Sequence, residues 1–311
     1  MDISILLALQ NFRNTAGAFL ADFLSKMTFF GELNTTLVIF SIIYWCVSKD
    51  FGTYLMMGWS GNRLFNGFLK ITACVYRPWI RDERIIPYGN SMNTATGYSF
   101  PSGHTTNVST YFGGIIVRKD KSKALRIISF IIICLVAFSR LYLGVHTPQD
   151  VLVSAIGGLL IMWLTTKLMK WLNENPNKSY IVVIIGIILA IGLAIYGNFK
   201  SYPVDYNAAG ELIVDGKKMA NDTFKGVGWV IAFLIGWLLE KKFINFTTDI
   251  SLEKRVIRLL VGMLLFYVVS LIVMPWIKQI FAGALGTIIS CFIQMFFITF
   301  IYPLLIKQFE K

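Results

Sequence analysis

The chemistry of this chain is indicated first by its histidines, because its 311 residues include only two, His104 and His146. Histidine carries protons near neutral pH and can also act as a nucleophile. A single histidine in an apolar chain is more often a structural hydrogen-bonding residue. Here each histidine is embedded in a polar cluster, which favours a role in catalysis.

The cluster around His146 reads Ser139-Arg-Leu-Tyr-Leu-Gly-Val-His-Thr-Pro-Gln-Asp150. Thr147 is a candidate N-cap, and the proline after it occupies the favoured first position of a helix. If the turn brings Asp150 and His146 to one face, the carboxylate can accept a hydrogen bond from one imidazole nitrogen. The other nitrogen is then free to act as a nucleophile. Asp150 also fits the acidic position of a capping box, and the two roles are compatible.

The cluster around His104 is the string Pro101-Ser102-Gly103-His104, which opens a predicted membrane span. A helix N-terminus presents free N–H groups and partial positive charge, and it therefore favours an anion such as phosphate. Gly103 lets an anion approach the backbone, and Ser102 adds a hydroxyl donor. The alternative is an ordinary helix start with Ser102 as its cap.

Three cations accompany these clusters: Lys70 and Arg77 in the string Lys70-Ile-Thr-Ala-Cys-Val-Tyr-Arg77-Pro78, and Arg140. Cations at a membrane surface often contact only lipid headgroups. Arginine, however, binds phosphate oxygens in pairs, lysine acts as a point charge, and such a set stabilises a transferring phosphoryl group. Since Asp150 is the only carboxylate that these motifs supply, the sequence predicts chemistry without a metal or other cofactor.

Along the chain, the motifs Lys70-x6-Arg77-Pro78, then Pro101-Ser102-Gly103-His104, then Ser139-Arg140-x5-His146-x3-Asp150 resemble the type 2 phosphatidic acid phosphatase superfamily, and the resemblance covers about residues 30–200. It implies a six-helix membrane core with its site at the outer face. It also implies that His146 attacks phosphorus to form a phosphohistidine, that Asp150 orients His146, and that His104 is the acid and base. The residues that it implies for binding phosphoryl oxygens are Lys70, Arg77, Ser102, Gly103 and Arg140. The strings Tyr-Trp-Cys at 44–46 and Gly-Tyr-Ser-Phe at 97–100 are similar to bacterial members, which predicts a bacterial source.

The composition agrees with a membrane location for these motifs. Hydrophobic residues make up 56% of the chain, charged residues 15%, and the mean hydropathy is +0.64. These values exclude a soluble globular domain, which has about 25% charged residues. The net charge of +12 fits basic membrane loops better than nucleic-acid binding. The sequence predicts an all-helical membrane protein with spans at 32–48, 52–70, 103–117, 124–140, 149–171, 179–198, 225–240, 256–276 and 282–306.

The distribution of charge predicts which side each loop faces. Alternating spans place loops 49–51, 118–126, 167–178, 241–258 and 307–311 together, and these hold 16 of the 29 Lys and Arg residues. Because cytoplasmic loops are enriched in Lys and Arg, this side is predicted to be cytoplasmic. The polar clusters are then predicted to face outward from the cell membrane.

The predicted organisation has three parts: an amphipathic interfacial segment at 1–30, the phosphatase core at 31–200, and a three-helix extension with an outer polar loop at 201–311. Within that loop, residues 211–219 are predicted to form a hairpin turning at Asp215-Gly216. Asn62, Arg63 and Asn66 form a polar stripe that either extends the headgroup site or is a structural network. Free cysteines are expected, with no disulfide framework.

We expect a phosphatase of lipid phosphates or diphosphates whose substrate reaches the site laterally from the membrane. The candidate substrates are isoprenoid, glycerolipid and sphingoid phosphates, and the other expected partners are membrane lipids. A phosphatase of soluble sugar phosphates, similar to the glucose-6-phosphatase type, is an alternative. A transporter or binding protein for lipids or anions is a second alternative, disfavoured because it would not need two histidines and a carboxylate. The oligomeric state cannot be deduced from the sequence.

Overall fold

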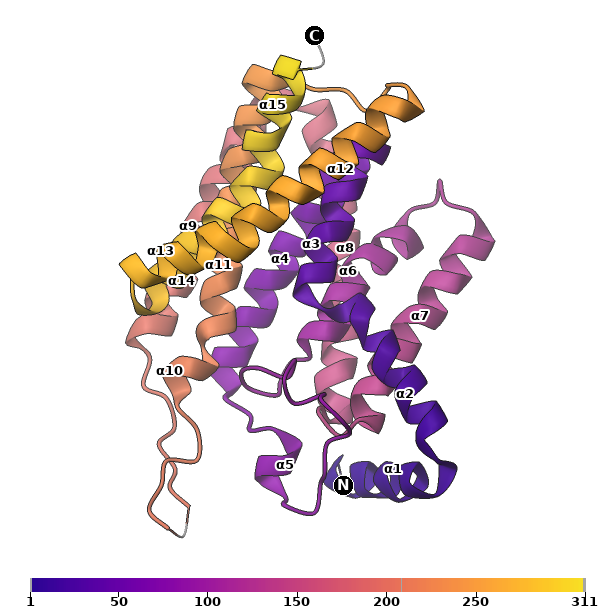
Figure 1. Ribbon diagram of the computed structural model, residues 1–311, viewed down its shortest axis with the longest axis vertical. Coiled ribbons are helices and arrows are strands. Elements are labelled where there is room, and N and C mark those ends of the chain that lie inside the picture. The colour runs from indigo at the N-terminus through magenta and orange to yellow at the C-terminus, as the bar shows by residue number, and fades with distance from the viewer. Residues whose placement is uncertain (1, 208, 310–311) are drawn as a thin grey trace. The chain divides into compact units, whose positions relative to one another are not determined.

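The computed structural model describes residues 2–207 and 209–309, and within these residues it contains helices and one isolated antiparallel bridge (Figure 1). The all-helical prediction is therefore confirmed. Lys311, the last basic residue of the predicted loop 307–311, lies outside the described residues.

All nine predicted spans coincide with helical segments. Two of the segments continue from one α-helix into another through a π-helical turn, at Val269–Val273 and Phe297–Ile301. The α-helices of the nine segments are α3 (Leu33–Ile42), α4 (Lys49–Ala73), α6 (Gly103–Val117), α7 (Lys123–Tyr142), α8 (Pro148–Glu174), α9 (Ser179–Phe199), α11 (Asn221–Leu239), α12 (Leu252–Val268) with α13 (Met274–Ile280), and α14 (Gly283–Phe296) with α15 (Tyr302–Phe309).

Five of these segments are long and apolar enough to cross a membrane by themselves: α7, α8, α9, α12 with α13, and α14 with α15. A sixth candidate is the pair Ala18–Gly31 and Leu33–Val47, which is bent by 55°. The apolar helices account for the composition and identify the chain as a multi-pass membrane protein.

The chain divides into two compact units. The first unit comprises residues 1–36, 65–164 and 200–222, and it contains every residue predicted for the site. The second unit comprises residues 37–64, 165–199 and 223–311. The three-part organisation deduced from the sequence stays a prediction.

In the first unit, α1 (Asp2–Ala16) and α2 (Ala18–Met27) meet at an elbow at Gly17 (Figure 1). The φ of +80° at Gly17 lies in the left-handed region that glycine adopts without strain. A 3₁₀ turn, η1 (Thr28–Gly31), follows α2.

The polar face of α1 is bound to the loop that follows α5 (Pro78–Arg81). Gln10 donates to the carbonyl of Arg84 at 2.8 Å and accepts from the N–H of Ile86 at 2.7 Å. Arg13 donates to the carbonyls of Ile86 and Tyr142 at 2.6 and 3.0 Å. The exposed side chains of this segment include four phenylalanines: Phe12, Phe19, Phe23 and Phe29.

The second unit buries polar groups of its own. Arg63 is 5% exposed and lies 5.8 Å from the ring of Trp59 and 5.7 Å from that of Trp229. Glu240, which is 1% exposed, accepts from Lys49 at 2.9 Å. Each charge is thus placed against an aromatic ring or an opposite charge, as burial in an apolar environment requires.

The hairpin predicted for residues 211–219 is wrong. The carboxylate of Asp215 accepts from the N–H groups of Lys217 and Lys218 and so caps a short helix, α10 (Gly216–Met219). The antiparallel bridge lies earlier, between Tyr206 and Leu212. Because aspartate caps helices as readily as it forms turns, the Asp-Gly pair begins a helix here.

Candidate active site

The position of His146 is set by the way α7 ends. Gly144 adopts a φ of +74°, its N–H donates to the carbonyl of Leu141 at 2.9 Å, and the N–H of Val145 donates to the carbonyl of Arg140 at 3.1 Å. These two bonds form a Schellman motif, in which glycine is favoured because its φ is positive. The N–H of His146 also donates to the Arg140 carbonyl, at 3.2 Å. The backbone of His146 is therefore fixed to the end of α7.

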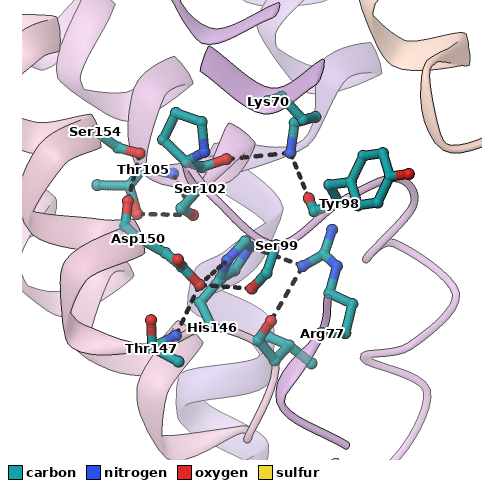
Figure 2. A network of polar contacts seen from close by, with 12 residues as sticks. Lys70, Arg77, Tyr98, Ser99, Ser102, Thr105, His146, Thr147, Asp150 and Ser154 are labelled. Carbon is teal, nitrogen blue, oxygen red and sulfur yellow. Dashed lines mark hydrogen bonds and ion pairs between the residues drawn. The ribbon is translucent and has the colours of Figure 1, made fainter. Parts of the chain in front are cut away.

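The carboxylate of Asp150, in the first turn of α8, collects three donors on its Oδ2 atom (Figure 2). Ser99 donates its hydroxyl at 2.6 Å, and Thr147 donates its backbone N–H at 2.8 Å. The third partner is Nδ1 of His146, at 3.1 Å. Asp150 thus acts both as the acid of a capping box and as the partner of the imidazole, and the two interpretations of the sequence hold together.

The hydrogen bonds around His146 define its tautomer. Nε2 lies 3.0 Å from Nη1 of Arg77, and a guanidinium can only donate, so Nε2 is the acceptor. The carboxylate of Asp150 accepts, so the proton of a neutral imidazole sits on Nδ1. Burial is the largest cause that lowers the pKa of His146 to about 3, and the charge of Arg77 contributes. The imidazole is therefore neutral at pH 7, with a lone pair on Nε2.

Arg77 is buried and held by backbone carbonyls. Its Nε donates to Gly97 at 2.9 Å, its Nη2 to Thr96 at 2.7 Å, and its Nη1 to Val145 at 3.0 Å. Burial lowers the pKa of Arg77 to about 10, against the opposing effect of nearby carboxylates. The guanidinium remains positive at pH 7 and is fixed beside His146 (Figure 2).

Lys70, in the last turn of α4, is held in the same way. It is 4% exposed and donates to the carbonyls of Tyr98 at 2.7 Å and Pro101 at 3.1 Å. One turn earlier, Asn66 donates to the hydroxyl of Thr106 in α6 at 2.9 Å. The polar face of α4 is therefore joined to the segment that leads into α6.

The start of α6 has the serine cap that was the alternative interpretation of this string, and its role in binding an anion stays a prediction. Ser102 is the N-cap, and its side chain accepts from the N–H of Thr105 at 3.4 Å. The N–H of Ser102 donates to the carbonyl of Asp150 at 3.1 Å, which joins the two histidine clusters. A Cβ built on Gly103 meets no described atom within 4 Å, so this N-terminus has open space beside its first residue.

His104 lies in the first turn of α6 and packs tightly against Gly31. A Cβ on Gly31 would lie 2.7 Å from the Cβ of His104 and 2.9 Å from its Cδ2. Asn107 fixes this approach by donating to the carbonyl of Gly31 at 2.8 Å. The buried Nε2 of His104 has no hydrogen-bond partner among the described residues. The charges of Lys70, Arg77 and Arg140 act on this imidazole, and His146 is also within electrostatic reach.

Arg140 differs from the other two cations. Its side chain is 0% exposed, and none of its three guanidinium nitrogens has a hydrogen-bond partner in the part of the chain that the structure describes. A buried, unsatisfied guanidinium costs several kcal/mol, and an anion with several oxygens would offset that cost. Arg140 therefore fits an oxyanion that binds within reach of Arg77 and His104.

All eight residues predicted for the catalytic and phosphate-binding roles belong to the first unit, whereas Asn62 and Arg63 of the polar stripe belong to the second. The groups that hold these side chains in place were not predicted from the sequence. Ser99, which bonds Asp150, stands in the string Gly-Tyr-Ser-Phe that carried part of the resemblance. The carbonyls that hold Lys70 and Arg77 have no signal in the sequence, because every residue carries a carbonyl group.

Two protein families match the chain. The PAP2 superfamily matches residues 51–174, and the transmembrane extension of PAP2 superfamily phosphatases matches residues 224–311. Together they cover more than half of the chain. The first match includes all eight residues predicted for the site.

Two relatives are similar over shorter segments. An undecaprenyl-diphosphatase of Sulfolobus acidocaldarius is 38% identical over 84 residues, which are 27% of this chain and 38% of that protein. A phosphatidylglycerophosphatase B of Bacillus subtilis is 34% identical over 122 residues, which are 36% of this chain and 55% of that protein. The matches thus span less than two thirds of either relative.

Among solved structures, the crystal structure of a transmembrane PAP2 type phosphatidylglycerolphosphate phosphatase from Bacillus subtilis is similar to the chain. The sequences are 27% identical, the TM-score is 0.45, and the alignment covers 54% of this chain and 84% of that one.

The lowered pKa of His146 predicts that the stability of the protein depends on pH. Below pH 6.5 the unfolded chain binds a proton at this residue, whereas the folded chain remains neutral down to about pH 3. The stability of the folded state is therefore complete above pH 6.5 and is lost progressively as the pH falls towards 3. We expect wild-type protein to lose about 1.4 kcal/mol more per pH unit in this range than His146→Asn. Thermal unfolding in detergent at pH 7.5, 6 and 5 measures this difference, and a parallel loss in both proteins would contradict it.

Proposed function

The chain belongs to the PAP2 superfamily, and we propose that it is a membrane phosphatase that hydrolyses lipid phosphates or diphosphates through a phosphohistidine intermediate. The observation that carries the proposal is the imidazole of His146, held at Nδ1 by Asp150 and at Nε2 by Arg77. A neutral imidazole whose reactive lone pair faces a phosphate-binding cation is arranged to attack phosphorus.

In the first step, the lone pair of His146 Nε2 forms a bond to phosphorus while the bond between phosphorus and the leaving oxygen breaks. The leaving oxygen keeps that electron pair and takes a proton from His104. The bound phosphate adds negative charge beside His104, which favours its protonated form. The phosphorylated ring of His146 keeps its Nδ1 proton and is positive, and the carboxylate of Asp150 stabilises this charge.

In the second step, His104 takes a proton from a water molecule whose oxygen attacks phosphorus. The bond between phosphorus and Nε2 breaks, and its electron pair returns to His146. Phosphate is released, and His104 holds a proton for the next substrate. His104 thus acts first as an acid and then as a base.

The phosphoryl oxygens are assigned to Lys70, Arg77 and Arg140, with Ser102 and Gly103 at the N-terminus of α6. Arg140 has all its guanidinium donors available among the described residues, and Gly103 has open space beside it. Arg77 already donates to Nε2, so attack by this lone pair requires the N–H to turn from the nitrogen to an oxygen of the bound phosphate. The same cations stabilise the charge that is spread over the oxygens in the transition state.

The proposed substrate class is supported by the membrane setting and by the relatives. The site residues lie at the ends of α4, α6, α7 and α8, where a lipid headgroup can enter while its tails stay in the bilayer. One relative is named for undecaprenyl diphosphate and the other for phosphatidylglycerophosphate, which makes these two lipids the first substrates to test. The loops that the sequence predicts to be cytoplasmic are rich in Lys and Arg, which supports an outward-facing site in a bacterial cell membrane.

Changing His146 to Ala should abolish turnover, because the variant lacks the atom that attacks phosphorus. Purified protein in detergent is assayed for phosphate release from undecaprenyl diphosphate, phosphatidylglycerophosphate, phosphatidic acid and glucose 6-phosphate. We expect release from the lipids only, and a loss of at least about a thousandfold in the folded variant. Equal activity of wild type and variant would exclude His146 as the nucleophile, and release from glucose 6-phosphate alone would favour the soluble-phosphate alternative.

Hydrolysis should persist in EDTA, because the carboxylate of Asp150 already holds three donors on one oxygen. Orthovanadate, which resembles the transferring phosphoryl group, should inhibit the enzyme. Its inhibition constant should rise at least about tenfold in Arg140→Ala, which removes the unpartnered guanidinium. A strict requirement for Mg²⁺ would contradict the metal-independent mechanism.

The close packing of Gly31 and His104 predicts a selective loss of catalysis in Gly31→Ala. The added Cβ displaces His104, and small misplacements of a catalytic group cost up to about a hundredfold in rate. The loss should be larger for phosphatidic acid than for p-nitrophenyl phosphate, whose leaving group needs little protonation. Gly192→Ala is the control, because a Cβ there meets no described atom within 4 Å. An equal loss for both substrates would argue against His104 as the acid.

A further inference from the structure

We propose that Asp222, which lies in the first turn of α11, is a positioning residue that acts through Thr96 on the phosphate-binding Arg77. This inference deepens the proposed function and rests on it. The residues involved all belong to the first unit, although Asp222 lies far along the chain from the three motifs.

The first link is the set of carbonyls that hold Arg77. Two of its three backbone acceptors are consecutive, Thr96 at 2.7 Å from Nη2 and Gly97 at 2.9 Å from Nε. These two carbonyls define the plane and direction of the guanidinium. Nη1 of that guanidinium donates to Nε2 of His146 at 3.0 Å. A displacement of the segment 96–97 would therefore alter both the phosphate contact and the environment of the nucleophile.

The second link is the side chain of Thr96. Its hydroxyl donates to Oδ2 of Asp222 at 2.8 Å. Thr96 thus uses its carbonyl to hold Arg77 and its hydroxyl to hold Asp222. The bond lies at an exposed position, so its contribution is modest and is expected to appear in the function of Arg77 rather than in global stability.

The third link is the close contact between Gly97 and the residues before and at Asp222. Gly97 has a φ of +73°, and a Cβ there would lie 2.9 Å from the carbonyl oxygen of Met219 and 3.3 Å from Oδ2 of Asp222. The absence of a side chain at Gly97 lets the backbone of α10 approach the segment that holds Arg77. Two adjacent residues of this segment are therefore supported from the same side.

The negative charge of Asp222 supports Arg77 in addition to the hydrogen bond through Thr96. Burial lowers the pKa of Arg77, and the carboxylates of Asp150 and Asp222 oppose this effect. Asp150 is occupied by His146, Ser99 and Thr147, whereas Asp222 approaches the guanidinium from the side of Thr96. Asp222 therefore both supports the carbonyls that hold Arg77 and favours its positive charge.

The test compares Asp222→Ala and Thr96→Val with a control from the segment between α9 and α10. Asp205 is the matched control, because its carboxylate accepts from the hydroxyl of Tyr76 at 2.6 Å, also at an exposed position. The readouts are KM and kcat for a short-chain phosphatidic acid, the inhibition constant of orthovanadate, and the rise in unfolding temperature that orthovanadate produces.

We expect Asp222→Ala and Thr96→Val to raise KM and the inhibition constant of orthovanadate about three- to tenfold, with a smaller change in kcat. Thr96→Ser, which keeps the hydroxyl, should restore wild-type constants, and Asp205→Asn should leave them unchanged. In an Arg77→Lys background, Asp222→Ala should have no further effect, since coupled residues are not additive. If Asp222→Ala does not fold, the inference is tested with Thr96→Val instead.

Wild-type constants in Asp222→Ala and Thr96→Val would overturn the inference, as would equal losses in Asp205→Asn or full additivity with Arg77→Lys. These outcomes are distinct from a failure of the proposed function, which would appear as a wild-type protein that releases no phosphate from any lipid. The thermal shift with orthovanadate does not need turnover, and a shift of equal size in wild type and Asp222→Ala would by itself contradict the role of Asp222.

Discussion

The burial of positive charge around one neutral imidazole is the constraint on which the first unit depends. Lys70, Arg77 and Arg140 are each at most 4% exposed, and a buried charge is costly unless its donors are satisfied. Lys70 and Arg77 meet this requirement with backbone carbonyls, which neutralise no charge. The site thus remains positive while its cations stay fixed, which suits the phosphate dianion of the proposed reaction.

This constraint also explains why the chain is irregular where the helices end. Carbonyls inside a helix are already bonded, so acceptors for buried cations must come from segments outside helices. The segments before α6 and after α7 supply them, at Tyr98, Pro101 and Val145. The Schellman motif at Gly144 ends α7 sharply, and the N-cap at Ser102 marks the start of α6. Helix ends, rather than helix faces, therefore build the site.

The sequence predicted the parts of this arrangement that depend on side-chain type. The helical class and the pairing of His146 with Asp150 followed from hydropathy and spacing, and the structure agrees. The carbonyl acceptors could not be predicted, because they depend on backbone direction alone. The contact of Thr96 with Asp222 joins residues far apart in sequence, and nothing local marks it. The prediction of a hairpin at Asp215-Gly216 was wrong, because the same two residues can also cap and begin a helix, as they do in α10.

In the proposed mechanism, phosphate binding and the nucleophilicity of His146 have the same electrostatic origin. The cations that attract phosphate also disfavour protonation of His146, whose pKa burial and Arg77 lower to about 3. Asp150 opposes them, but it acts at Nδ1 and so fixes the proton on the nitrogen that does not attack. An N–H of Arg77 donates to the lone pair on Nε2, and a bound oxyanion would compete for this N–H. In the proposed mechanism, the arriving phosphate draws this donor from the nitrogen to an oxygen, so that substrate binding itself frees the lone pair that attacks.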